Sequence, residues 1–344
     1  MDARGTIRFA VIGVNHGHIY SQTQLLLNAG AELASFFAPE PELRQEFGRA
    51  FPQVRMAQSE VEILEDPTID LVASAAIPAD RAGLGIRVMQ HGKDFMSDKP
   101  AFTTQAQLAE ARRVQAETGR IFSVDYAERL ENRATVKAAE LVRSGAIGQV
   151  VNTVGLGPHR ARFHTRPWWF TVRERFGGIL IDIASHQFDQ FLYFTQATDV
   201  TIVQAQVANF HHPQYPEFED FGDVLLRTPT ATGYIRVDWF TPEGLETWGD
   251  TRLTVIGTDG YIEVRKNADI CGRPGGDHLF LVDQKGTHYV DCRDVELPYG
   301  RLLLDDIRNR TETAMSQEHA FRAAELALQA QAQATRLGHL AAAV

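Results

Sequence analysis

A regular alternation of short apolar runs and amphipathic segments of helix length fills the first 125 residues and limits the folds open to this chain. The expected strands are residues 6–12, 33–37, 70–75, 94–97 and 121–124, and the expected helices are 19–28, 41–50, 81–90 and 105–118. Strands that are apolar throughout are buried on both faces, as in a parallel sheet whose crossover helices pack on either side. We therefore predict an α/β fold that begins with a doubly wound parallel sheet.

The pattern changes after residue 125, so we predict a first domain over 1–125 and a second over 126–344. Helices are expected at 133–144, 180–194 and 317–337, and strands near 148–156, 200–208, 222–228, 232–239, 252–256, 260–265, 278–283 and 286–291. Turn signals such as Thr258-Asp259-Gly260 and Gln284-Lys285-Gly286 join neighbouring strands. Such turns are typical of hairpins, which indicates a mostly antiparallel sheet in the second domain.

Composition excludes several classes of partner. The chain carries 44 acidic against 34 basic residues, a net charge of −10, which disfavours a nucleic-acid or anionic membrane partner. No apolar stretch approaches the roughly 18–20 residues that cross a bilayer. The two cysteines, Cys271 and Cys292, form neither a disulfide framework nor a metal knuckle, so we expect a cytoplasmic protein without a metal centre.

The first strand ends in Gly13-Val14-Asn15-His16-Gly17-His18, directly before a helix. This position suits a dinucleotide pyrophosphate, because glycines allow close approach and the helix start offers N–H groups. The dinucleotide fingerprint has glycine where Asn15 and His18 stand, and we expect His18 to loosen the packing of the helix. By itself the turn is equally compatible with an ordinary strand-to-helix connection.

The residue that should bind the adenosine ribose is Ala38, at the end of the second strand. A carboxylate at that place would favour NAD, and a following arginine would favour the 2′-phosphate of NADP. Neither is present, so the sequence leaves the choice between NAD and NADP open.

Four further segments, in this order and spacing, resemble the Gfo/Idh/MocA oxidoreductases, the family of glucose–fructose oxidoreductase and inositol dehydrogenase. They are Ile77-Pro78, the Gly92–Pro100 segment with Asp98-Lys99-Pro100, Arg129, and the segment from Gly177-Gly178 through Asp182 and His186 to Asp189. The family's Glu-Lys-Pro has become Asp98-Lys99-Pro100, whereas its Gly-Gly-x-Leu-x-Asp-x-x-x-His-x-x-Asp pattern is intact.

The resemblance implies a Rossmann domain, a second α/β domain with a large open sheet, a nicotinamide cofactor, and homodimers or homotetramers formed through that sheet. It implies that the cofactor is held by Gly13, Val14, Asn15, His16, Gly17, Ala38, Ile77, Pro78 and Asp98. The cofactor contacts are where this sequence departs most from the family.

Three residues are candidates for proton transfer. Asp182 and His186 lie four residues apart, so one helix would place them on the same stripe, with Asp189 and Tyr193 one and two turns further on. A carboxylate one turn away can orient a histidine for acid–base work near neutral pH. Lys99 follows a buried strand, at the edge where open α/β sheets bind ligands. A structural Asp–His pair and a solvated lysine are the alternatives.

Residues just before the Gly-Gly pair are candidates for binding substrate. Trp168 could stack on the apolar face of a sugar, and His164 and Arg166 could bind hydroxyls, with Arg129 and Asp189 as further candidates. A tryptophan pair packed in the core is equally compatible with this segment.

Together these features predict an NAD(P)-dependent oxidoreductase that acts on a sugar, inositol or related polyol. A catalytically silent dinucleotide-binding sensor is the main alternative. An enzyme that uses tightly bound NAD transiently for elimination or hydrolysis is another.

Overall fold

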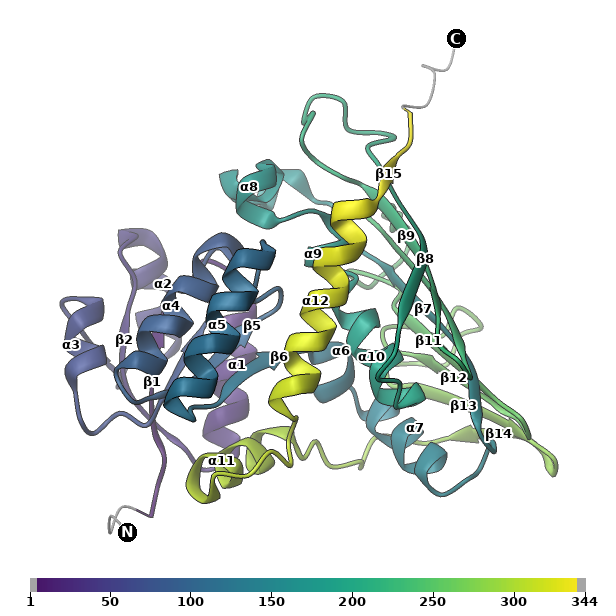
Figure 1. Ribbon diagram of the computed structural model, residues 1–344, viewed down its shortest axis with the longest axis horizontal. Helices are drawn as coiled ribbons and strands as arrows, with labels where there is room; N and C mark the ends of the chain where they lie inside the picture. The colour runs from purple at the N-terminus through teal and green to yellow at the C-terminus, as the bar shows by residue number, and fades with distance from the viewer. Residues whose placement is uncertain (1–4, 339–344) are drawn as a thin grey trace. The chain divides into compact units, whose positions relative to one another are not determined.

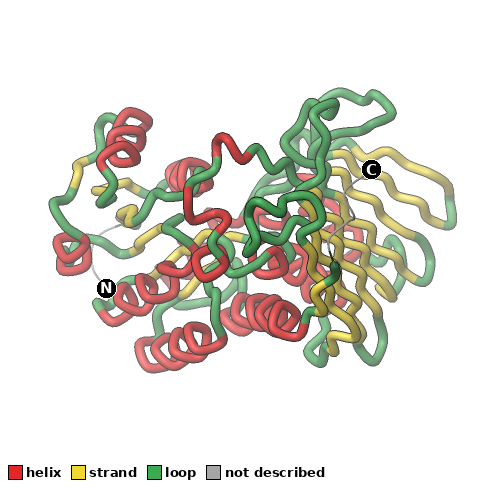
Figure 2. Tube along the Cα trace, turned by 90° about the horizontal axis from the view of Figure 1, so that it is seen from above, coloured by secondary structure: helices red, strands yellow, loops and turns green. Residues whose placement is uncertain are grey.

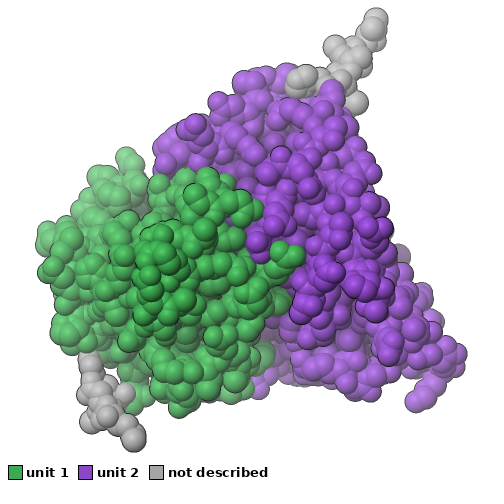
Figure 3. Space-filling view, viewed as in Figure 1, with its two compact units in different colours: residues 1–125, 298–322 green, residues 126–297, 323–344 purple. Residues whose placement is uncertain are grey.

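The computed structural model describes residues 5–338, and the chain divides into two compact units (Figure 3). The first comprises residues 1–125 and 298–322, and the second comprises 126–297 and 323–344. The sequence had led us to place 298–322 in the second domain, whereas the structure groups this segment with the first.

Within residues 5–125, six strands form one parallel sheet in the order β3-β2-β1-β4-β5-β6 (Figure 1). They are β1 (Arg8–Ile12), β2 (Glu32–Phe37), β3 (Arg55–Met56), β4 (Leu71–Ser74), β5 (Asp94–Asp98) and β6 (Phe122–Asp125). Because the chain leaves β1 toward β2 and later returns to β4 on its other side, the strand order reverses at β1. The predicted Rossmann sheet is confirmed, and such a reversal is where doubly wound sheets bind dinucleotides.

The helices of this unit are α1 (His18–Asn28), α2 (Pro41–Ala50), α3 (Glu60–Glu65), α4 (Pro78–Gln90), α5 (Gln105–Thr118) and α11 (Tyr299–Asn309). Figure 1 shows α4 and α5 in front of the sheet and α1 behind it. Local signals explain sharp ends such as those of α5, where Thr104 forms a capping box and Gly119 ends the helix in the left-handed conformation. The pattern analysis missed β3 and α3 because they have only two and six residues.

Direct contacts attach α11 and its flanks to the first unit. Arg310 forms a two-pronged ion pair with the buried Asp94 of β5, at 2.7 and 2.8 Å. The Tyr299 hydroxyl lies 2.7 Å from that of Ser123. A Cβ at Gly300 would lie 2.9 Å from the side chain of Leu25, so glycine lets α11 approach α1 closely. These long-range contacts carry no periodic signal, which is why sequence analysis did not detect them.

We predict that Arg310→Met destabilises the first unit by about 2–3 kcal/mol, because it leaves the buried Asp94 carboxylate without its charged partner. Urea unfolding followed by circular dichroism measures this loss. Arg308→Met is the matched control, since Arg308 pairs with Asp305 on the exposed side of the same helix. Equal destabilisation by both variants would contradict the role given to Arg310.

Within residues 126–338, nine strands form a second sheet in the order β14-β13-β12-β11-β7-β10-β9-β8-β15 (Figure 2). They are β7 (Val150–Pro158), β8 (Thr201–Ala208), β9 (Phe221–Arg227), β10 (Thr232–Asp238), β11 (Arg252–Gly257), β12 (Tyr261–Arg265), β13 (His278–Asp283), β14 (Gly286–Val290) and β15 (Thr335–Arg336). The pairs β7–β10 and β8–β15 are parallel and the others are antiparallel. The mostly antiparallel sheet is thus confirmed.

Helices cover one face of this sheet (Figure 1), among them α6 (Ala127–Leu130), α7 (Arg133–Arg143), α10 (Ser185–Thr195) and α12 (Gln317–Gln333). Glycines on the strands let α10 pack closely, since a Cβ at Gly155 would lie 2.7 Å from Gln187 and one at Gly233 would lie 2.5 Å from Phe191. The opposite face carries large exposed apolar side chains, including Leu225, Ile256, Tyr261 and Tyr289.

The expected helix over 180–194 is wrong in one respect, because it is divided in two. It consists of α9 (Ile179–Asp182) and α10, separated by a turn at Ile183 and Ala184. The N–H of His186 bonds to Ile183 three residues back, and isoleucines at 181 and 183 weaken the helix here. Asp182 therefore precedes the helix that carries His186, Asp189 and Tyr193. The expected tail helix also stops early, at Gln333, before the edge strand β15.

None of the helices within residues 5–338 is both long enough and apolar enough to cross a membrane.

Candidate active site

The turn after β1 can be built only with glycine at position 13. Gly13 has a φ of +79°, and a Cβ there would lie 2.6 Å from that of Ala76. Hydrogen bonds fasten the turn on both sides, from the Gly13 N–H to Phe37 in β2 at 3.1 Å and from the His16 N–H to Ala75, just past β4, at 2.9 Å. The turn is therefore a fixed cradle between the carboxyl ends of β2 and β4.

The start of α1 is suited to an anion. The helix dipole places partial positive charge at this end, although the first N–H groups are already engaged: that of His18 bonds to His16 Nδ1, and those of Ile19 and Tyr20 bond to the backbone oxygens of His16 and Gly17. The other expected cofactor residues lie at the same sheet edge: Val14 and Ala38 are buried after β1 and β2, and Ile77 and Pro78 begin α4 after β4. The structure thus brings these residues together at one edge of the sheet, and their role in binding the cofactor stays a prediction.

Glu40 is a candidate cofactor residue that the sequence analysis missed. Its Oε1 accepts a 2.8 Å hydrogen bond from Asn15, the residue that replaces the second glycine of the fingerprint. Its Oε2 is buried and has no hydrogen-bond partner among the described residues. Ala38 stands where the fingerprint has a carboxylate. Glu40, two residues later, places its carboxylate beside the glycine turn. A ribose hydroxyl would satisfy the unpartnered oxygen.

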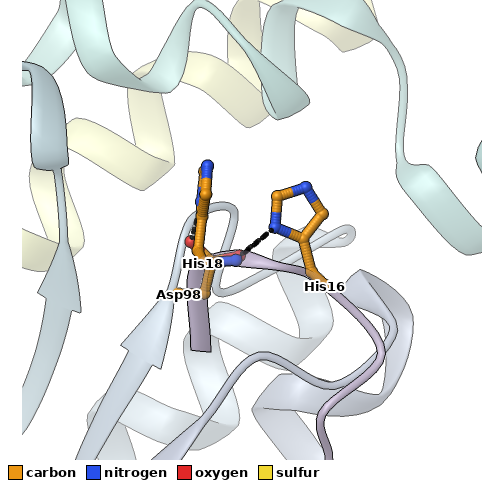
Figure 4. Close-up of side chains that lie close together, drawn as sticks. All are labelled: His16, His18 and Asp98. Carbon is orange, nitrogen blue, oxygen red and sulfur yellow. Dashed lines mark hydrogen bonds and ion pairs between the residues drawn. The ribbon is translucent and has the colours of Figure 1, made fainter. Parts of the chain in front are cut away.

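Asp98, the last residue of β5, is the centre of a charged cluster (Figure 4). Its carboxylate is fully buried and lies 2.9 Å from the Nδ1 of His18 and 2.9 Å from the guanidinium of Arg81. Arg81 is itself buried and donates to the backbone oxygens of Ala76 and Pro100. The His18 ring points to Asp98; whether His18 loosens the packing of α1 stays a prediction.

Burial determines the electrostatic state of His16 in this cluster. Burial, together with the neighbouring His18, holds the pKa of His16 well below its ordinary value. His16 Nδ1 accepts a hydrogen bond from the His18 N–H at 3.3 Å, so its 3.5 Å separation from Asp98 is not an ion pair at neutral pH. Burial alone would raise the pKa of Asp98, but Arg81 and His18 hold it well below its ordinary value. Asp98 is therefore a carboxylate that only accepts hydrogen bonds.

Ligand atoms of His16, His18 and Asp98 lie within 4.8 Å of one another, as in a metal site. The surrounding charge opposes a cation, because Arg81 already neutralises Asp98 and the positive end of α1 adds to that charge. The cluster fits a ligand of negative charge better.

We predict that the stability of the first unit falls as pH decreases below about 6.5, because the unfolded chain binds a proton at His16 that the folded chain resists. His16→Gln should remove about 1 kcal/mol of this dependence between pH 7 and 5.5. Urea unfolding at a series of pH values measures it, with His91→Gln at the exposed end of α4 as control. An unchanged pH dependence in His16→Gln would contradict the assignment.

The proposed proton-transfer residues lie in different units. Lys99 is buried in the first unit, directly after β5. In the second unit, His186 is buried near the start of α10 with its ring 6.4 Å from that of Tyr126, and Asp182 lies partly buried at the end of α9. Burial lowers the pKa of Arg166, which the Asp182 carboxylate partly offsets. The catalytic roles of Lys99, Asp182 and His186 stay predictions.

Two of the expected substrate residues bind each other. Arg129 in α6 forms a two-pronged ion pair with the fully buried Asp189 in α10, both bonds being 2.7 Å. The Arg129 guanidinium also lies 4.5 Å from the centre of the Tyr193 ring. This pair fixes α6 against α10, so the geometry gives both residues a structural task.

The other expected substrate residues form part of an aromatic region. Trp168 is 67% exposed, His164 is exposed, and Trp169 is the tryptophan buried in the core. Arg166 donates to the backbone oxygens of Arg160 and Ala161 and lies over the rings of Phe170 and Trp239. Its planar group is thus held rigidly between aromatic faces.

Two further residues of this region were missed by the sequence analysis. The His159 ring follows β7 and lies edge-on to Trp248, with centroids 4.6 Å apart. Trp248 is 42% exposed, and the Lys266 ammonium lies 5.7 Å from its ring and 3.0 Å from Glu128. The end of a strand was the one available signal for His159, whereas Trp248 lies in an irregular loop.

Comparison with protein families matches both halves of the chain. Residues 7–126 match the oxidoreductase family with an NAD-binding Rossmann fold, and residues 135–263 match the GFO/IDH/MocA C-terminal domain. The chain belongs to the Gfo/Idh/MocA oxidoreductase family. The resemblance seen in the Asp98-Lys99-Pro100 and Gly177–Asp189 motifs is thereby confirmed.

The chain is similar to proteins named as inositol and sugar dehydrogenases. The chain is 24% identical over 287 residues to scyllo-inositol 2-dehydrogenase (NAD(+)) of Bacillus subtilis, covering 82% of this chain and 79% of the relative. A crystal structure from Erwinia carotovora atroseptica is 48% identical, with a TM-score of 0.94 over 97% of this chain and all of the other. Levoglucosan dehydrogenase in complex with NADH shares the fold, with a TM-score of 0.77 at 16% identity over 95% of this chain and 97% of the other.

Proposed function

We propose that this protein is an NAD(P)-dependent dehydrogenase that transfers a hydride between nicotinamide and a sugar, inositol or related polyol. The observation that carries the proposal is the fixed Gly13 turn at the reversal of the strand order, in a chain of an NAD-binding family. The named dehydrogenases of inositol and levoglucosan support the substrate class.

The residues at the sheet edge fit the cofactor. The turn from Gly13 to Gly17 and the start of α1 would hold the diphosphate, while Ile77 and Pro78 would line the nicotinamide side. Nicotinamide supplies the hydride donor or acceptor when bound. The chain's own task is to orient the two reactants and to move a proton.

Glu40 favours NAD over NADP. Its unpartnered Oε2 would accept a hydrogen bond from a ribose hydroxyl, whereas the 2′-phosphate of NADP would meet the carboxylate with like charge. The hydrogen bond from Asn15 holds the Glu40 carboxylate beside the turn. This carboxylate would therefore take the place of the acidic residue that is absent at Ala38.

We predict that the wild-type protein binds NADH about 10-fold or more tightly than NADPH, because a hydrogen bond to a charged group is worth about 1.5–3 kcal/mol. Glu40→Gln should bring the two dissociation constants within about threefold of each other. Titration of tryptophan fluorescence measures both. Glu42→Gln, exposed in the first turn of α2, is the control, and a preference unchanged in Glu40→Gln would refute the assignment.

We further propose that Lys99 and His186 carry the proton transfer. In the oxidation direction one of them takes the proton of the substrate hydroxyl as the hydride leaves the adjacent carbon. Asp182 would orient the pair or adjust its charge. Because Asp182 lies before α10 and not on its stripe, it acts from the turn that precedes His186.

We predict that Lys99→Met and His186→Ala each lower kcat by about 10²–10⁴-fold, the range typical of a general acid or base. The double variant should be hardly slower than the slower single variant, since residues that act as one unit are not additive. Initial rates at 340 nm with NAD and a panel of inositols and aldoses measure this. Near-full turnover in either single variant would exclude that residue from the chemistry.

The aromatic region of the second unit supports a carbohydrate substrate. Exposed indoles such as those of Trp168 and Trp248 can stack on the apolar face of a sugar ring, and His164, Arg166 or the Lys266–Glu128 pair can bind hydroxyls. Arg129 and Asp189 bind each other, so we give them a positioning role in place of substrate contact.

We also infer assembly into homodimers or homotetramers through the uncovered face of the nine-stranded sheet. Burial of its exposed Leu225, Ile256 and Tyr261 against a second copy would stabilise the assembly. The two cysteines are unpaired thiols, Cys271 exposed and Cys292 buried, which favours a cytoplasmic location.

A further inference from the structure

We propose that His18, oriented by Asp98, is a ligand for the diphosphate of the dinucleotide and that binding the dinucleotide makes His18 take up one proton. This inference rests on the proposed function, because the ligand is the cofactor of that function. It assigns a new role to a residue that stands where the dinucleotide fingerprint has its third glycine.

The hydrogen bond to Asp98 determines what the His18 ring can offer. Asp98 is buried and ionised, so in the 2.9 Å contact it accepts and His18 Nδ1–H donates. In a neutral ring the remaining nitrogen, Nε2, then carries a lone pair and no proton. Phosphate oxygens accept hydrogen bonds, so a neutral His18 would oppose them, whereas a protonated His18 would donate from Nε2.

The position of His18 suits this contact. It is the first residue of α1, directly after the glycine turn, and 39% of its side chain is exposed. Its partner Asp98 ends β5, on the side of β1 away from β2, so the ring reaches toward the nicotinamide half of the crevice. A diphosphate at the start of α1 would lie beside it.

The neighbouring charges explain why a proton is needed. Arg81 from α4 and Asp98 form an ion pair without net charge, His16 in the turn is held neutral by its lowered pKa, and Lys99 lies directly after β5. A diphosphate would add two negative charges beside this ion pair. A proton on His18 would offset one of these charges and give Nε2 a hydrogen to donate to a phosphate oxygen.

Calorimetric titration of the full chain with NADH at pH 7.5, in buffers with different ionisation enthalpies, counts the protons exchanged. We expect the wild type to take up about 0.5–1 proton per NADH, and its Kd to rise by up to about tenfold per pH unit between pH 7 and 9. His18→Gln should bind more weakly, with no proton uptake and a Kd independent of pH.

Two further variants secure the interpretation. His18→Arg, which always carries a donor, should bind NADH at pH 9 at least as tightly as the wild type does at pH 7, without proton uptake. His91→Gln, at the exposed end of α4, should behave like the wild type. Circular dichroism compares the fold of each variant with that of the wild type. If His18→Gln does not fold, the result for His18→Arg still tests the inference.

Wild-type binding of NADH without proton uptake, or uptake that persists in His18→Gln, would overturn the inference and leave the proposed function intact. If the wild type binds neither NADH nor NADPH, the proposed function fails and this inference fails with it.

Discussion

The burial of the Asp98 carboxylate at the end of β5 is the interaction on which the first unit depends most. A carboxylate without water must be matched by charge and hydrogen bonds, and here the match comes from Arg81 in α4 and His18 in α1. The Asp98 carboxylate therefore links two helices, α1 and α4, to the end of β5. The hydrogen bond to Asp98 also explains how a histidine can occupy position 18, where the dinucleotide fingerprint has glycine.

A second constraint is the close approach of the glycine turn to β4. Because Gly13 meets Ala76 with no room for a side chain, the turn has one conformation, and it presents the start of α1 to the sheet edge. Asn15 then reaches Glu40, so the turn also fixes the carboxylate that would face the adenosine ribose. In the proposed function, cofactor binding and cofactor choice would thus both depend on this one segment.

In the second unit, close packing at glycines and a buried ion pair position the helices. Glycines at 155 and 233 bring α10 onto the sheet, and the Arg129–Asp189 ion pair locks that helix against α6. His186 is held in this framework, while the aromatic region around Trp239 and Trp248 lies on loops. Loops carried by such a rigid framework can vary without disturbing the fold, which is how one fold can serve different ligands.

By itself the sequence determined the architecture: apolar periodicity predicted the strands of the parallel sheet and of the large antiparallel sheet, because periodicity records which faces are buried. Local motifs likewise indicated the glycine turn, the Asp98-Lys99-Pro100 segment and the Asp182–Asp189 segment. Only the tertiary structure decided that 298–322 joins the first unit, that Asp182 precedes α10, and that Arg129 and Asp189 bind each other. It also decided that Glu40 binds Asn15 of the turn and that His18 binds Asp98. These outcomes depend on contacts between residues far apart in the chain, such as Arg310 with Asp94 or His18 with Asp98, and such contacts leave no periodic trace in a single sequence.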